Sequence, residues 1–213
     1  MSEPKAIARK IEEIIPGVWR WYVHDDRIDS ESDAHAVVEG GRVVLIDPLP
    51  LAKASLKRLG TVEAICLTAK CHQRSAWRYR KQFGVKVYAP QGIRPTDEEP
   101  DVMYRAGDQL PGGLQAILTP GPENVHFAFW LAREPGVLFC PDLLMHAEGK
   151  ELDFVPAEFH DAPAETRASV QRLLELRFSI LCFNHGAPIT DDPHAALREV
   201  LKRDAEQAAR KST

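Results

Sequence analysis

Residues 33–48 read DAHAVVEGGRVVLIDP, and they carry the strongest fold signal of the chain. Two runs of small and β-branched residues, Ala34–Glu39 and Arg42–Ile46, flank a pair of glycines. A two-residue glycine loop between such runs is typical of a tight β-hairpin. The second run ends in Asp47, so the stretch predicts a strand that delivers a carboxylate at its carboxyl end.

The segment that follows alternates helical and strand patterns. Helical spacing over 51–59 stops at Gly60, and an apolar run over 63–68 predicts a buried strand. That strand is followed at once by the polar residues AKCHQR, positions 69–74, and a helix is predicted from about Gln73 to Phe83. This alternation predicts a mixed sheet that is covered by helices.

The second half of the chain repeats the outline of the first. Residues 137–140 predict a hairpin strand that is followed by Asp142, and residues 179–183 predict a strand that is followed by His185. Together with Asp47 and His72, these residues are expected at equivalent strand ends. Because mixed sheets bind ligands where loops leave the carboxyl ends of strands, we expect the four to converge on one cleft.

The remaining elements follow from local patterns. A helix is predicted over 6–15, and another over 164–177 with Asp161 as its cap. A charged helix is predicted over 193–211. Further strands are expected at 17–23, 86–89, 114–119 and 126–132, and the segments 24–32, 90–101 and 145–161 are expected to be polar loops. Four histidines are expected in solvent because they lie in polar segments or at helix starts: His24, His146, His160 and His194.

Composition indicates a soluble globular protein. The chain has 213 residues, a net charge of -4, 44% hydrophobic and 27% charged residues, which predicts a single domain over 1–213 with residues 1–15 and 205–213 peripheral. The absence of a basic cluster argues against nucleic-acid and membrane partners and favours a small-molecule substrate or ligand. Four cysteines and an amino terminus without an apolar signal segment predict a cytoplasmic location.

Four further phrases, added to residues 33–48, carry a resemblance to a known family. They are AICLTAKCHQRSA at 64–76, LTPGPENVH at 118–126, VLFCPDLL at 137–144 and FNHGAP at 183–188. In this order the five phrases resemble the metallo-β-lactamase superfamily, of the hydroxyacylglutathione-hydrolase-like kind. The resemblance implies an αββα four-layer sandwich of two mixed β-sheets with outer helices, and a zinc-dependent hydrolase.

The metal-binding motif of that family is degenerate here. Its His-x-His-x-Asp-His ligand positions fall on Ala69, Cys71, Gln73 and Arg74. A further ligand histidine falls on Pro122, whereas the bridging carboxylate and the last histidine are kept as Asp142 and His185. His126 matches a histidine that usually supports the site without ligating the metal. The resemblance therefore implies at most one metal ion.

One hypothesis is a hydrolase with a single zinc, manganese or iron ion. Asp142, His185 and Cys71 would hold the ion, and a bound water would attack an ester, thioester or lactone. Because adjacent residues rarely point at the same place, we expect either Cys71 or His72 to ligate the ion, but not both.

Two alternatives remain open. A metal-free protein would bind a small anion or a partner in the same cleft through Arg74, His72 and Lys70, with Asp47 and His126 nearby; Arg74 could then neutralise a carboxylate that otherwise binds metal. In the other alternative Cys71 is a nucleophile that His72 or His185 activates. The sequence does not predict the oligomeric state.

Overall fold

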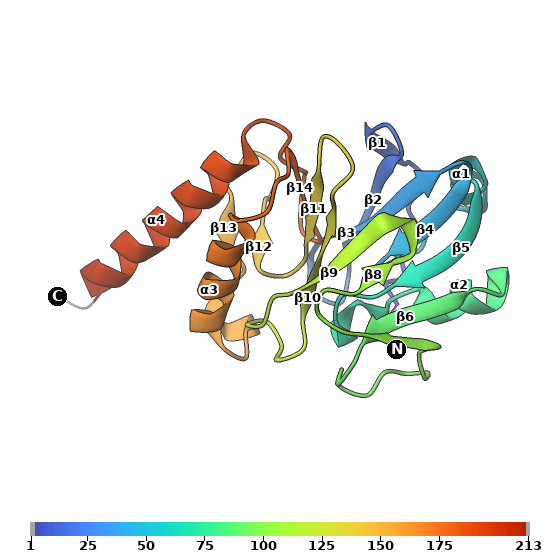
Figure 1. Cartoon of the computed structure of the whole chain (residues 1–213), viewed down its shortest axis with the longest axis horizontal. Helices are drawn as coiled ribbons and strands as arrows, with labels where there is room; N and C mark the ends of the chain where they lie inside the picture. Colours follow the sequence, from blue (N-terminus) through green and yellow to red (C-terminus); the bar gives the residue numbers. More distant parts are fainter. Residues whose placement is uncertain (1–2, 212–213) are drawn as a thin grey trace. The chain divides into compact units, whose positions relative to one another are not determined.

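The computed structural model describes residues 3–211. The chain divides into two compact units, Met1–Ala116 and Ile117–Thr213, and each unit has strands and helices of its own. The expectation of a single domain stays a prediction. The two units are described one after the other (Figure 1).

The first unit is built on a seven-stranded mixed sheet in which the strands follow chain order. Neighbours from β1 to β4 are antiparallel, and neighbours from β4 to β7 are parallel. The strands are β1 (Glu12–Ile15), β2 (Val18–Asp25), β3 (Ser30–Glu39), β4 (Arg42–Ile46), β5 (Thr61–Cys66), β6 (Lys86–Pro90) and β7 (Val102–Tyr104). The change to parallel pairing at β4 places the ends of β4 and β5 at the same edge of the sheet.

The predicted hairpin at residues 33–48 is confirmed. β3 and β4 pair with Glu39 opposite Arg42, and Gly40 and Gly41 form the turn with φ of 56° and 77°. Both values lie in the left-handed region, which glycine adopts without steric cost and which a two-residue turn requires.

The helices of the first unit are short. They are α1 (Lys53–Leu59), the 3-10 turns η1 (Lys70–Gln73) and η2 (Pro111–Gly113), and α2 (Ala76–Phe83), which contacts β5 and β6. The helix predicted from Gln73 begins only at Ala76, because Arg74 has a φ of 33° that interrupts it. Its predicted end at Gly84 is confirmed by a left-handed φ of 65°.

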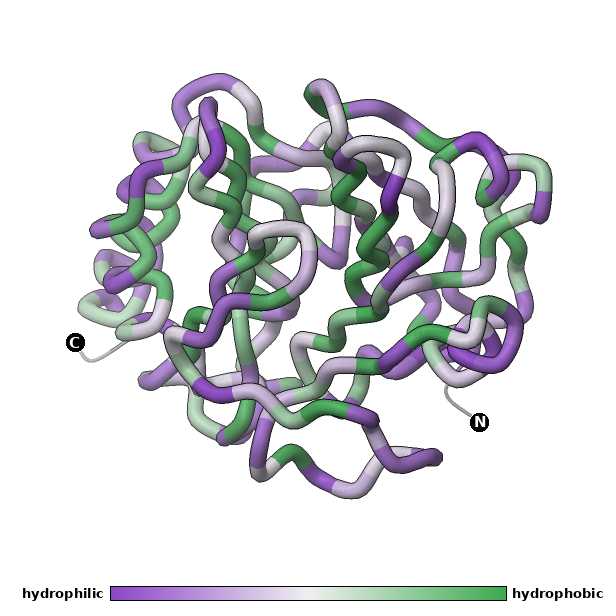
Figure 2. The backbone as a smooth tube through the Cα atoms, turned by 45° about the vertical axis from the view of Figure 1, so that its right-hand side comes forward, coloured by the Kyte–Doolittle hydropathy of each residue, from purple (hydrophilic) through white to green (hydrophobic). Residues whose placement is uncertain are grey.

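The core of the first unit lies between the sheet and these helices. Its buried hydrophobic residues lie mostly on β2 to β6, α1 and α2, and Figure 2 colours each residue of the backbone by its hydropathy. Trp21 and Tyr79 are both fully buried, and both donate a hydrogen bond to the main-chain oxygen of Leu49, at 3.1 and 3.2 Å. Burial of aromatic surface supplies most of the stabilisation, and the shared carbonyl fixes how the two rings are oriented.

The second unit contains a smaller mixed sheet. β10 (Phe127–Leu131) and β11 (Val137–Cys140) are antiparallel, and β14 (Ile180–Phe183) runs parallel to β11. β9 (Leu114–Leu118) crosses the boundary between the units, and its first residues pair with β8 (Gln109–Leu110) in the first unit. The helices of the second unit are the 3-10 turn η3 (Ala157–Phe159), α3 (Pro163–Leu173) and α4 (Pro193–Lys211). α3 packs against α4 (Figure 1).

Several predictions from local patterns are wrong. Residues 6–15 form no helix, because Glu12–Ile15 folds back through a turn at Pro16–Gly17 and pairs with β2. The segment 145–161, expected to be a loop, contains β13 (Asp153–Phe154), which pairs with β12 (Leu144–Met145). The residue that caps α3 is Ala162, without a side-chain cap bond, and not Asp161. Tertiary pairing decided these regions against their local propensity.

Among the described residues, no helix has the length and apolar character needed to span a membrane.

Candidate functional site

Two strand ends in the first unit bring Asp47 and the η1 turn together. β4 and β5 are parallel, with Ile46 opposite Cys66, and the Asp47 amide donates to the Cys66 carbonyl at 3.1 Å. Asp47 has a φ of 46°, which is uncommon for a residue other than glycine and tolerated best by Asn and Asp. This backbone turn points the carboxylate toward the loop that follows β5.

A hydrogen-bond chain links Asp47 to His72 through Thr68. The Thr68 amide donates to Asp47 Oδ1 at 2.9 Å, and the Thr68 hydroxyl donates to Asp47 Oδ2 at 2.5 Å. Because its proton is used in that bond, Thr68 Oγ1 accepts from His72 Nδ1, at 2.8 Å. His72 Nδ1 also lies 3.2 Å from Asp47 Oδ2. The proton of the ring is therefore fixed on Nδ1, and Nε2 is the atom at which the ring can bind a proton or a metal ion.

The Asp47–His72 pair is deeply buried. Asp47 has a side-chain exposure of 0% and His72 of 3%. Burial alone would raise the pKa of Asp47, but His72, Arg74 and the hydrogen bond from Thr68 hold it below its usual value. Asp47 is thus an ionised carboxylate that is kept inside the unit by its partners.

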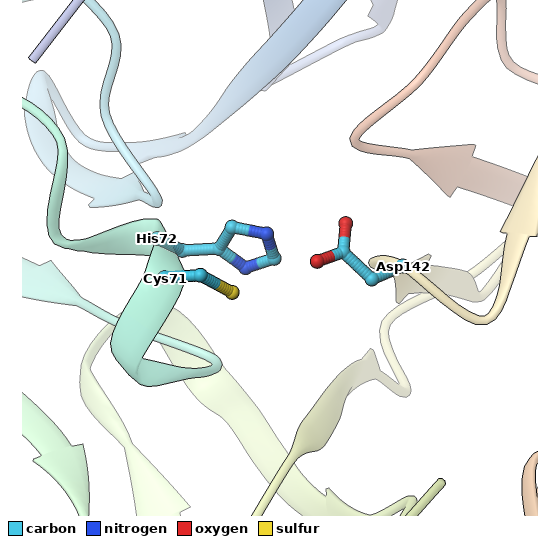
Figure 3. Close-up of side chains that lie close together, drawn as sticks. All are labelled: Cys71, His72 and Asp142. Carbon is cyan, nitrogen blue, oxygen red and sulfur yellow. The ribbon is translucent and has the colours of Figure 1, made fainter. Parts of the chain in front are cut away.

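Cys71 lies beside this pair on η1. Of the four cysteines, all of which are described, Cys71 alone is exposed. Its Sγ lies within 4.8 Å of a ring nitrogen of His72, and Figure 3 shows both side chains leaving η1 on the same side. These two neighbours therefore point to the same side, and the expectation that only one of them ligates an ion stays a prediction.

The other cysteines are unreactive by environment. Burial raises the pKa of Cys66 and of Cys140 well above the usual value for a thiol. Cys182 is also buried. These three are small core residues, as their positions in apolar runs predict.

Gln73 and Arg74 make contacts inside the first unit. Gln73 Oε1 accepts hydrogen bonds from Trp77 Nε1 at 2.7 Å and from the Asp97 amide at 2.8 Å. Arg74 is buried, and its Nη1 donates to the carbonyls of Asp33 at 2.7 Å and Asp47 at 3.3 Å. Both residues hold loops in place. They stand at two of the positions where the family resemblance implies metal ligands.

The second unit has a matching pair of strand ends. β11 and β14 are parallel, with Cys140 opposite Phe183, so Asp142 and His185 follow at one edge. Asp142 has a φ of 34°, and its Oδ1 lies 3.2 Å from His185 Nε2. The two side chains are 19% and 17% exposed. Figure 3 labels Asp142 in the loop after β11.

His160 also contacts the Asp142 strand end. Its Nε2 lies 3.0 Å from the main-chain oxygen of Asp142, and its Nδ1 lies 2.9 Å from the hydroxyl of Thr166 on α3. Burial lowers the pKa of His160. The expectation of a solvated side chain is wrong here, because the ring bridges segments 18 residues apart. A sequence pattern carries no signal for such a contact.

The remaining histidines are mostly structural. His126 is buried, and its Nδ1 lies 3.0 Å from the Thr119 hydroxyl and 2.9 Å from the Thr119 carbonyl, which ties the ends of β9 and β10 together. His146 bonds to the Ala187 carbonyl, and His194 bonds to the Leu176 carbonyl, so neither is simply solvated as expected. His24 is exposed and faces Asp29. A ligand-binding role for His126 stays a prediction.

Mixed sheets with helices packed on them define an α+β fold, and here acid and histidine pairs stand at its parallel strand ends. A family model described as the metallo-β-lactamase superfamily matches residues 13–203. The chain therefore belongs to the metallo-β-lactamase superfamily and has its fold.

Solved structures agree on the fold. The chain is similar to the DIM-1 metallo-β-lactamase, with a TM-score of 0.74 and 13% identity over 93% of this chain and 99% of that one. A metallo-β-lactamase family protein from Thermus thermophilus has a TM-score of 0.69 and 19% identity, over 93% of this chain and 81% of that one. The metallo-β-lactamase FIM-1 from Pseudomonas aeruginosa, in its mono-zinc form, has a TM-score of 0.69 and 14% identity, over 96% of this chain and 99% of that one. No curated protein matches the sequence.

Members of this superfamily usually bind zinc, and the residues present decide how many ions could fit. The full two-zinc set does not fit, because Gln73 and Arg74 are engaged elsewhere and Pro122 has no donor atom. The donors that remain are a carboxylate with an imidazole in the second unit and a thiol with an imidazole in the first. Nitrogen, sulfur and carboxylate donors of this kind suit zinc, manganese or iron.

Proposed function

We propose that the protein is a metallo-β-lactamase-fold hydrolase that works with one metal ion. Its substrate is a small molecule with an ester, thioester or lactone bond, including the thioesters that hydroxyacylglutathione-hydrolase-like members cleave. The Asp142–His185 pair carries the proposal, because a carboxylate oxygen and an imidazole nitrogen meet 3.2 Å apart at two parallel strand ends, on side chains that are 19% and 17% exposed.

Asp142 and His185 would supply two ligands, and the expectation that Cys71 or His72 adds a further ligand stays a prediction. His72 is the better prepared of these two, since Thr68 and Asp47 hold its Nδ1 proton and turn Nε2 into the ligating atom. A carboxylate behind a ligating histidine orients the ring and raises its basicity. FIM-1 in its mono-zinc form indicates that a protein of this fold can hold a single ion.

The metal ion, when bound, would polarise the scissile carbonyl and lower the pKa of a bound water. The chain's own residues have separate tasks. Asp142 and His185 hold donor atoms at a fixed separation on rigid strand ends. Thr68 and Asp47 fix the tautomer of His72. Gln73 and Arg74 brace the loop that carries Cys71.

Metal content tests this proposal. Protein that is purified after supply of zinc, manganese and iron should carry about one ion per chain by elemental mass spectrometry. Asp142→Asn, His185→Gln and His72→Gln should each lower the content. Asp191→Asn removes an exposed carboxylate of the second unit and serves as the matched control. Wild-type protein without metal would show that the one-ion proposal is wrong.

A thiol mechanism is the second candidate, because exposed Cys71 lies within 4.8 Å of His72. In that case Cys71→Ser would abolish hydrolysis of a thioester probe in metal-free protein, while removal of metal would have no effect. Loss of activity on chelation would exclude it. Both candidates fit a reducing cytoplasm, where a free thiol persists.

A further inference from the structure

We infer that His160 is a positioning residue for Asp142, and that Thr166 fixes the ring of His160 for this task. The metal-binding consequence rests on the proposed function. The hydrogen-bond geometry stands without it.

The direction of each hydrogen bond follows from its atoms. The main-chain oxygen of Asp142 can only accept, so His160 Nε2 carries the proton and donates over 3.0 Å. In the neutral ring Nδ1 then has the lone pair and accepts from the Thr166 hydroxyl over 2.9 Å. One proton arrangement satisfies all the atoms, and it runs from α3 through His160 to the end of β11.

Asp142 needs such support because its backbone is held in an unfavourable conformation. Its φ of 34° lies in the left-handed region, which persists in a residue other than glycine only where surrounding contacts enforce it. A donor on the Asp142 carbonyl fixes the peptide plane after the residue. Fixing this plane orients the Cα–Cβ bond and the carboxylate that faces His185.

The hydrogen-bond chain from Thr166 through His160 to Asp142 is held in place by the segment after β9. The Ala162 amide donates to the Gly121 carbonyl at 2.9 Å, and the Asp161 amide donates to the Pro122 carbonyl at 3.2 Å. Gly121 has a φ of 140°, and a Cβ there would lie 2.2 Å from Thr166 Oγ1. Only glycine at position 121 allows Thr166 to sit at its present place. Pro122, which replaces a family metal ligand, thus lies in a segment that holds His160.

The first test measures the tautomer of His160 by long-range proton–nitrogen NMR of metal-free protein at neutral pH. We expect the Nε2–H form in wild-type protein, and a mixture of tautomers in Thr166→Val, which keeps the side-chain shape without the donor. Glu165→Gln is the control, because Glu165 lies exposed in the first turn of the same helix. A wild-type ring in the Nδ1–H form would overturn the inference.

The second test measures zinc affinity by competition with a chelator. His160→Phe and Thr166→Val should weaken zinc binding by about 10-fold or more, which is typical for the partners behind metal ligands. His160→Gln should recover most of the affinity, since its amide nitrogen takes the place of Nε2. Glu165→Gln should bind zinc like the wild type, and thermal unfolding of each variant separates lost positioning from lost folding.

The outcomes of the two tests separate this inference from the proposed function. Wild-type protein that binds no zinc but shows the Nε2–H tautomer contradicts the metal proposal and keeps the hydrogen-bond chain. Wild-type protein that binds zinc no more tightly than folded His160→Phe contradicts the positioning role.

Discussion

Two acid–histidine pairs, Asp47–His72 and Asp142–His185, share their place at strand ends and their oxygen–nitrogen distance, but they use different ring nitrogens and have different surroundings. Each pair joins the ends of two neighbouring parallel strands, each aspartate has a left-handed φ, and each oxygen–nitrogen distance is 3.2 Å. The first pair is 0% and 3% exposed, and the second is 19% and 17% exposed. The same backbone arrangement therefore gives a fully buried pair in the first unit and a partly exposed pair in the second.

Thr68 accounts for much of this difference. Its amide and hydroxyl both bond to Asp47, and its hydroxyl oxygen also accepts from His72, so the first pair is satisfied without water. A buried carboxylate is tolerated only with such partners. In the second unit, the polar group beside Asp142 is His160, which bonds to the main chain and leaves the carboxylate facing His185.

Removing the charge from each aspartate should give the largest difference in stability between the two pairs. Asp47→Asn should lower the free energy of unfolding by about 3 kcal/mol or more, because it breaks a buried charged network. Asp142→Asn should lower it by less than about 1 kcal/mol, because that side chain is partly solvated. Urea unfolding of both variants measures this, and equal losses would show that the two pairs do not differ as their burial indicates.

Acid should destabilise the first unit through a neighbouring histidine. Burial, together with the charges of Arg20 and Arg74, lowers the pKa of His35 to about 3, so the ring is neutral in the folded state. The unfolded chain binds this proton near its ordinary pKa of about 6.5. Stability from His35 is thus complete above that pH and is lost as the pH falls toward about 3, by up to about 1.4 kcal/mol per pH unit.

Urea unfolding between pH 7 and pH 5 measures this slope. His35→Gln has no such proton to take up and should show a flatter dependence on pH, whereas His24→Gln, which changes an exposed histidine, is the control. An unchanged slope in His35→Gln would contradict a neutral buried ring.

Cys71 should show the smallest effect on stability and a clear effect on reactivity. Cys71→Ser should change the free energy of unfolding by less than about 0.5 kcal/mol, because the side chain is exposed. In folded wild-type protein a thiol reagent should label Cys71 quickly and the three buried cysteines only after unfolding. Fast labelling that survives Cys71→Ser would place the reactive thiol elsewhere.

Much of the fold could be predicted from local patterns. The hairpin around Gly40 and Gly41 was predictable because its turn conformation is favoured by glycine, and the strand ends at Asp47 and Asp142 followed from apolar runs that stop at polar residues. The structure of residues 6–15 could not be predicted, because their amphipathic spacing suits a helix and only pairing with β2 makes Glu12–Ile15 a strand.

The sequence by itself determined most of the strands and the residues that stand at their ends, because these depend on short-range periodicity and on turn chemistry, and its motifs carried the resemblance to the superfamily. Only the tertiary structure decided that Thr68 closes the Asp47–His72 pair, that Cys71 and His72 face the same side, and that His160 reaches the carbonyl of Asp142. Those contacts join residues that are brought together only by packing. Burial also exists only once the chain has folded, and it is burial that distinguishes the enclosed Asp47 from the partly exposed Asp142.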